Sequence, residues 1–113
     1  MRPDERQTLE AVVDAVLAKG YRLRVWDGGD EPAVNVTGDR KTAIEGCDGV
    51  GEATLVIVRP GDRSIFGEIF LVFGNEPGVL ISDHTDVPEL TALLAPIAEL
   101  CDRVAATTHD WRT

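Results

Sequence analysis

The chain has 113 residues, 43% of them hydrophobic, and its 20 acidic and 11 basic side chains give a net charge of −9. This length fits one domain with one core, and the apolar share is that of a globular rather than a disordered chain. The acidity argues against direct binding to nucleic acid or to an anionic membrane, since both require basic patches. No run of about 18 apolar residues occurs, so we expect no membrane span, no export signal and a cytoplasmic location.

The two cysteines, Cys47 and Cys101, are too few and too far apart for a disulfide framework or a zinc site. Neither has a Cys-x-x-Cys partner or a nearby histidine base. We therefore expect buried, unreactive thiols in a reducing compartment, and no metal or other cofactor.

The N-terminal part predicts a helix followed by a β-hairpin. Apolar residues recur with the spacing of one helical stripe at Leu9, Val12, Val13, Val16 and Leu17. This pattern predicts a helix over about residues 4–19, which Gly20 ends. Residues 21–26 then alternate as a half-buried strand does, and the glycines and aspartates of 27–30 predict a turn to a second strand over 33–36.

The middle of the chain predicts a short helix and a long hairpin. Cap residues at 37–39 precede the short helix, expected over about 40–47, and a glycine-rich stretch leads from it into a strand over 53–59. The tight connection at 60–63 precedes the longest strand, expected over 64–73.

Both faces of this longest strand are apolar. Alternation puts Ile65, Ile69, Leu71 and Phe73 on one face. The opposite face then carries Phe66, Phe70 and Val72. A strand of this kind is either covered on both sides or presents one face to a partner, so we expect this second face to be covered or to form a dimer contact.

A short strand over 79–82 and a final helix complete the pattern. Asp86 is the expected helix cap, with Pro88 in the first turn and Glu89 three residues after the cap. The apolar stripe of the helix comprises Leu90, Leu93, Leu94, Ile97, Cys101 and Val104. Pro96 should kink or split the helix, and a frayed tail is expected over about 107–113.

These elements predict a single α+β domain over residues 1–113. The order is helix, strand, strand, helix, three strands, helix. A β-hairpin and a β-meander would supply an antiparallel sheet of about five strands, because the connections are too short for parallel crossovers. The two amphipathic helices would bury their stripes against one face of that sheet.

Residue types found in catalytic or metal sites lie close together in the sequence only at Ser82, Asp83, His84 and Asp86. Neighbours along a strand point to opposite faces, whereas a triad needs members that converge from separate elements. A metal would need further ligands, and the other histidine, His109, lies in the tail. The stretch is therefore interpreted as a strand exit followed by a helix cap.

Gly46, Gly49 and Gly51 form the pattern G-x-x-G-x-G, which is neither the dinucleotide fingerprint nor a P-loop. Both phosphate motifs run from strand through glycine loop to helix, whereas these glycines precede a strand. They are interpreted as a turn.

The charge pattern carries more information. Between Arg63 and Arg103 there is no lysine or arginine, while the acids are Glu68, Glu76, Asp83, Asp86, Glu89, Glu99 and Asp102. One interpretation is a solvated acidic surface that maintains solubility. The other is an acidic face that meets the basic surface of a nucleic-acid-binding protein.

Three stretches carry a family resemblance: residues 25–29 (VWDGG), 70–75 (FLVFGN) and 79–85 (VLISDHT). They resemble a family of small uncharacterised bacterial proteins often carried by phages and plasmids, over residues 21–104. These motifs are strand and turn signatures, so the resemblance implies no site residues. It implies a context in which small acidic proteins block host defence, some by imitating the charge of DNA.

Three hypotheses of function follow. The leading one is a non-enzymatic, acidic protein that binds a basic partner, such as an anti-CRISPR or anti-restriction inhibitor acting as a DNA mimic. The second is a small ligand-binding or metal-dependent enzyme domain that uses Asp83, His84 and Asp86. The third is a homodimeric structural module joined through the strand that carries Phe66 and Phe70.

Overall fold

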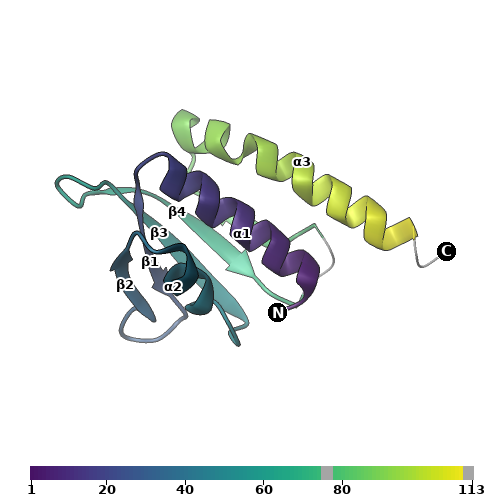
Figure 1. Ribbon diagram of the computed structural model, residues 1–113, viewed down its shortest axis with the longest axis horizontal. Coiled ribbons are helices and arrows are strands. Elements are labelled where there is room, and N and C mark those ends of the chain that lie inside the picture. Colours follow the sequence, from purple (N-terminus) through teal and green to yellow (C-terminus); the bar gives the residue numbers. More distant parts are fainter. Residues whose placement is uncertain (75–77, 111–113) are drawn as a thin grey trace.

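The computed structural model describes residues 1–74 and 78–110, with residues 104–110 as backbone only. The described chain has the predicted order of helices and strands (Figure 1). The elements are α1 (Pro3–Ala18), β1 (Arg22–Trp26), β2 (Val34–Thr37), α2 (Arg40–Glu45), β3 (Glu52–Val58), β4 (Ile65–Val72), β5 (Ile81–His84) and α3 (Pro88–Asp110). The α+β prediction is therefore confirmed.

The strands form one antiparallel sheet in the order β2-β1-β3-β4-β5. Pairing of β1 with β3 joins the N-terminal hairpin to the C-terminal meander and makes β3 the central strand. The helices lie on the same side of this sheet (Figure 1). One sheet face is thus covered by helices, and no described helix packs on the other.

The hydrophobic core fills the space between the sheet and the helices. From the sheet it takes alternate residues of three strands: Leu23, Val25, Leu55, Ile57, Ile69 and Leu71. From the helices it takes Leu9, Val12, Val13, Val16, Leu90, Leu94 and Ile97. These helix residues all belong to the stripes predicted from the helical spacing. Of the other predicted members, Cys101 is buried, Leu17 and Leu93 are partly buried, and the side chain of Val104 lies outside the described residues.

The start and the course of α3 differ from the prediction. The carbonyl of Val87 accepts the first helical hydrogen bond, from the Thr91 N–H at 3.0 Å, so Val87 occupies the cap position instead of Asp86. Pro96 does not split the helix, which continues to Asp110, beyond the expected end near residue 106. Pro96 and Ala92, whose carbonyl loses its helical donor, are both exposed, so water can replace the missing bond.

Two details of the meander also differ. β5 begins two residues later than expected, at Ile81, because its pairing with β4 sets Ile81 opposite Leu71 and Asp83 opposite Phe70. In β4, an irregularity opposite Ile57 and Val58 breaks the strict alternation. Phe66 therefore packs against the core, where its ring stacks on Tyr21 at a centroid distance of 4.6 Å. The predictions that Phe66 shares a face with Phe70 and Val72, and that Ile65 shares one with Ile69, are both wrong.

A buried carboxylate ties α1 to the end of β4. Glu5 is 4% exposed, and its two carboxylate oxygens accept the backbone N–H groups of Arg2 at 2.9 Å and of Gly74 at 2.6 Å. Burial by itself would raise the pKa of Glu5, but these two donors and the Arg2 charge together hold it below its ordinary value. The ionised form of Glu5 is therefore the one that stabilises the fold.

We expect Glu5→Gln to lower the free energy of unfolding by about 1–3 kcal/mol at pH 7, because two buried donors lose a charged acceptor. The stabilisation is present above the unfolded pKa of about 4.3 and is lost as the pH falls through the lower folded pKa. Urea unfolding of both proteins from pH 7 to pH 3 measures this. The exposed Glu31→Gln is the control. A wild-type advantage that persists unchanged at pH 3 would contradict the assignment.

The glycine stretch has a packing role at one position. A Cβ added to Gly46 would run into the Cγ2 atom of Val34 on β2, whereas one added to Gly51 would meet nothing within 4 Å. Gly46 therefore allows α2 to approach the edge of the sheet closely.

We expect Gly46→Ala to destabilise the fold by about 1–3 kcal/mol through overpacking. Gly51→Ala should change stability by less than about 0.5 kcal/mol, as surface changes usually do. Thermal unfolding of the two variants compares them directly. Equal stability would show that the α2 contact adjusts without cost.

Candidate functional site

We call the side of the sheet that no described helix covers the open face. Its side chains lie in rows across the strands. Strand pairing aligns Trp26, Thr54, Phe70 and Asp83 in one row across β1, β3, β4 and β5. The next row comprises Arg24, Val56 and Glu68, and the third comprises Arg22, Val58 and Ile65. These residues alternate along their strands with those that enter the core.

The centre of the open face is apolar and its sides are charged. Val56 and Val58 on β3 are 3% and 1% exposed, although both lie outside the core beneath the helices. Their neighbours across the sheet must therefore shield them. Trp26 and Phe70 are half-buried, and Ile65 is 55% exposed.

The charges of the open face are separated by sign. Arg22 and Arg24 lie on β1, while Glu68 and Asp83 lie on β4 and β5. β4 is two strand spacings from β1, about 10 Å, and β5 is one spacing farther. Among the described residues, no ion pair joins these arginines to these carboxylates, and the Nε of Arg24 is shielded from water without an acceptor.

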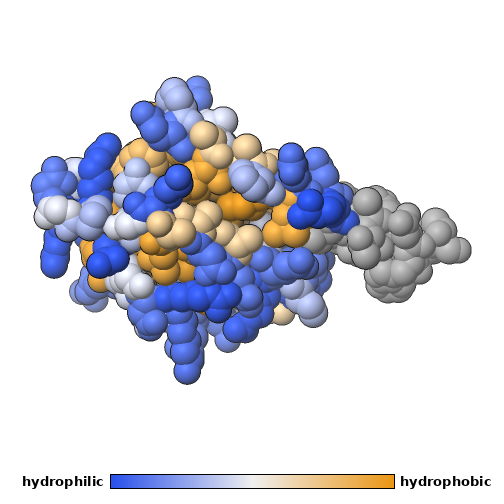
Figure 2. All heavy atoms as spheres, turned by 45° about the horizontal axis from the view of Figure 1, so that its top comes forward, coloured by the Kyte–Doolittle hydropathy of each residue, from blue (hydrophilic) through white to orange (hydrophobic). Residues whose placement is uncertain are grey.

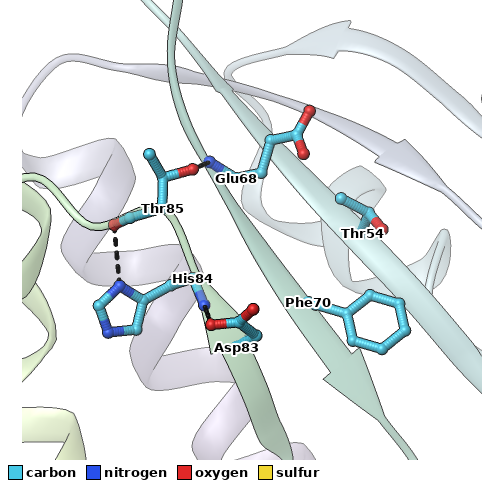
Figure 3. Close-up of a pocket in the computed structure, with 6 residues that line it drawn as sticks. All are labelled: Thr54, Glu68, Phe70, Asp83, His84 and Thr85. Atoms are coloured by element: carbon cyan, nitrogen blue, oxygen red, sulfur yellow. Dashed lines mark hydrogen bonds between the residues drawn. The ribbon is translucent and has the colours of Figure 1, made fainter.

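A recess of about 220 Å³ opens where β4 and β5 meet, lined by Thr54, Glu68, Phe70, Asp83, His84 and Thr85 (Figure 3). Thr85 fixes its rim. The Glu68 N–H donates to Oγ1 of Thr85 at 2.9 Å, and the Thr85 N–H donates to the Glu68 carbonyl at 3.0 Å. These two bonds extend the pairing of β5 beyond His84.

The groups in the recess do not form a catalytic triad. Nδ1 of His84 lies 2.9 Å from the carbonyl oxygen of Thr85, which can only accept, so Nδ1 carries the proton. The Asp83 carboxylate accepts the backbone N–H of His84 at 2.8 Å and not its ring (Figure 3). Within the described chain, no carboxylate therefore orients the imidazole as a general base requires.

The described residues also lack a cluster of three or more histidine, cysteine or acidic groups placed to hold a metal. Both cysteines are buried, as expected. Burial raises the pKa of Cys47 to about 12. Burial likewise raises the pKa of Cys101, with a smaller opposing effect from a Thr8 hydrogen bond. A thiol held neutral in this way is a poor nucleophile at pH 7.

The structure distributes the predicted acidic residues over two sides of the sheet. Glu68 and Asp83 are on the open face, and Asp86 is exposed in the connection between β5 and α3. Glu89, Glu99 and Asp102 are exposed on α3, on the helical side. Glu76 lies outside the described residues. The described acids thus do not form one continuous face.

The acids of α1 differ because they have arginine partners. Glu10 pairs with Arg6 at 2.9 Å and with Arg40 at 3.1 Å, and Arg40 also reaches Asp14 at 2.6 Å. Arg2 contacts Asp4 and Glu5 in the same way. The acids described between Glu68 and Asp102 have no such partner among the described side chains.

Comparisons with protein-family models, with curated proteins and with solved structures found no significant match to this chain. The family resemblance and the function therefore stay predictions. Within the described residues, no helix is both long and apolar enough to cross a bilayer.

Arg22, Arg24 and Trp26 form one side of the open face but are not among the predicted site residues. The alternation of residues 21–26 predicts that they lie on the face of the strand away from the core residues Leu23 and Val25. What the alternation could not show is that no helix covers that side.

We expect His84→Ala to leave stability and any binding activity nearly unchanged, because its ring makes one local bond to an exposed segment. Thr85→Val should cost about 1 kcal/mol, since the Glu68 N–H loses its acceptor. Thermal unfolding of both variants tests this. Loss of activity in His84→Ala at unchanged stability would revive the enzyme hypothesis.

Proposed function

We propose that this chain is a non-enzymatic, acidic interaction protein whose α3 side binds a basic protein partner. The observation that carries the proposal is the difference in ion pairing: the four acids of α1 pair with Arg2, Arg6 and Arg40, whereas the described acids from Glu68 to Asp102 have no such partner. No lysine or arginine lies between Arg63 and Arg103 in the sequence to offset these acids. Unpaired charge of one sign attracts an opposite surface over a distance of about 8 Å at physiological ionic strength.

The surface of α3 suits such a contact. Glu99 and Asp102 are one turn apart, and Glu89 lies about 15 Å before Glu99 along the helix axis. Glu89 borders a hollow of about 370 Å³ that is also lined by Lys19, Tyr21, Ala92 and Leu93. Apolar residues gather in the middle of this side of the molecule, surrounded by hydrophilic ones (Figure 2). Charged groups around an apolar centre are the usual composition of a protein interface.

A protein whose own ligand is nucleic acid is the partner class that this surface favours. Such proteins carry lysine and arginine where they contact phosphates, and spaced carboxylates on a helix can occupy that surface. Host defence nucleases belong to this class of partner. A role as an inhibitor of such nucleases agrees with the context that the family resemblance implies.

We expect a Glu89→Gln, Glu99→Gln, Asp102→Asn variant to bind purified, immobilised nucleic-acid-binding proteins at least about tenfold more slowly, with little change in folding. Association rates across a salt series measure this, and double-stranded DNA should compete. The control is Asp30→Asn, Glu31→Gln, Asp48→Asn, which removes the same charge from exposed positions elsewhere. Equal rates and equal salt slopes for the two variants would refute an α3 contact.

A further inference from the structure

The open face has a charge pattern that is complementary to itself. Positive side chains lie on β1, negative ones on β4 and β5, and the buried valines of β3 lie between them. A two-fold axis parallel to the strands and above β3 would place β1 of one copy over β4 of the other. A two-fold axis perpendicular to the strands would place arginine against arginine.

We propose that two copies of this chain pack through their open faces, with the two-fold axis parallel to the strands. In this register Arg24 faces Glu68 of the second copy, and symmetry repeats the pair. Trp26 faces Phe70 of the second copy in the adjacent row. Val56 lies on the axis, beneath these neighbours. Sheets that pack face to face lie about 10 Å apart, a distance that these side chains span.

Two features of the single chain support this occupant. The open face leaves apolar surface for a partner to cover, because Ile65 is 55% exposed and the rings of Trp26 and Phe70 are only half-buried. Within the described chain, Arg24 and Glu68 have no ion-pair partner. An acidic chain that binds itself needs some local positive charge, which β1 supplies.

The proposed contact differs from the one predicted from the sequence. Phe66, expected at the dimer face, stacks on Tyr21 beneath the helices. Phe70 remains on the open face, joined by Trp26, which the sequence analysis did not select. The α3 carboxylates of the proposed basic-partner site lie on the opposite side of the sheet, so both contacts can form at once.

Charge exchange tests the register. By sedimentation equilibrium, wild type should be a dimer, while Arg24→Glu and Glu68→Arg should each raise the dimer dissociation constant at least about 100-fold, because each creates two like-charge contacts. The double variant Arg24→Glu, Glu68→Arg should restore the dimer. Glu99→Arg on α3 is the control and should remain dimeric. A monomeric wild type at all concentrations, or single variants as dimeric as wild type, would overturn the proposal.

A second measurement covers the case in which a single variant fails to fold. In a Trp111→Phe background, Trp26 is the remaining tryptophan of the chain. Its emission should shift to shorter wavelength as concentration rises, since the dimer buries its ring, and Phe70→Ser should abolish the shift. A constant emission wavelength would refute contact at the open face. Neither result depends on the basic partner, so the two proposals fail separately.

Discussion

The structure depends on the burial of the central strand β3. Leu55 and Ile57 enter the core under the helices, while Val56 and Val58 are shielded on the other side by cross-strand neighbours alone. In a five-stranded sheet with helices on one side only, apolar side chains on the second side must be shielded from water by something other than helices. Arg22, Arg24, Trp26, Glu68 and Phe70 surround the valines on this face.

Charge is organised around the same sheet. Arg40 on α2 reaches Glu10 and Asp14 on α1, so acids and bases of the N-terminal part hold neighbouring helices together. Exposed pairs of this kind contribute little stability individually. Among the described residues, the acids of β4, β5 and α3 have no such partners. The side that carries α3 and the open face then differ in character: the first is acidic around an apolar centre, and the second carries both signs.

Much of the fold could be predicted because its signals are local. The stripe at Leu9, Val12 and Val16, the alternation of residues 21–26 and the turn residues each report on a few neighbours. The errors lie where distant contacts decide. The pairing register of β4 with β5 determines where β5 begins. The irregularity in β4 opposite Ile57 turns the Phe66 side chain toward the core. Pro96 is exposed, so α3 continues past it.

The sequence by itself determined the α+β class, the core stripes and the absence of basic residues between Arg63 and Arg103, because these follow from periodicity and composition. Only the tertiary structure decided which acids are paired, that the acids divide between two sides of the sheet, and that β1 and β4 carry opposite charges on an uncovered face. The physical reason is that pairing order and helix placement join residues far apart in the chain, which no local pattern encodes.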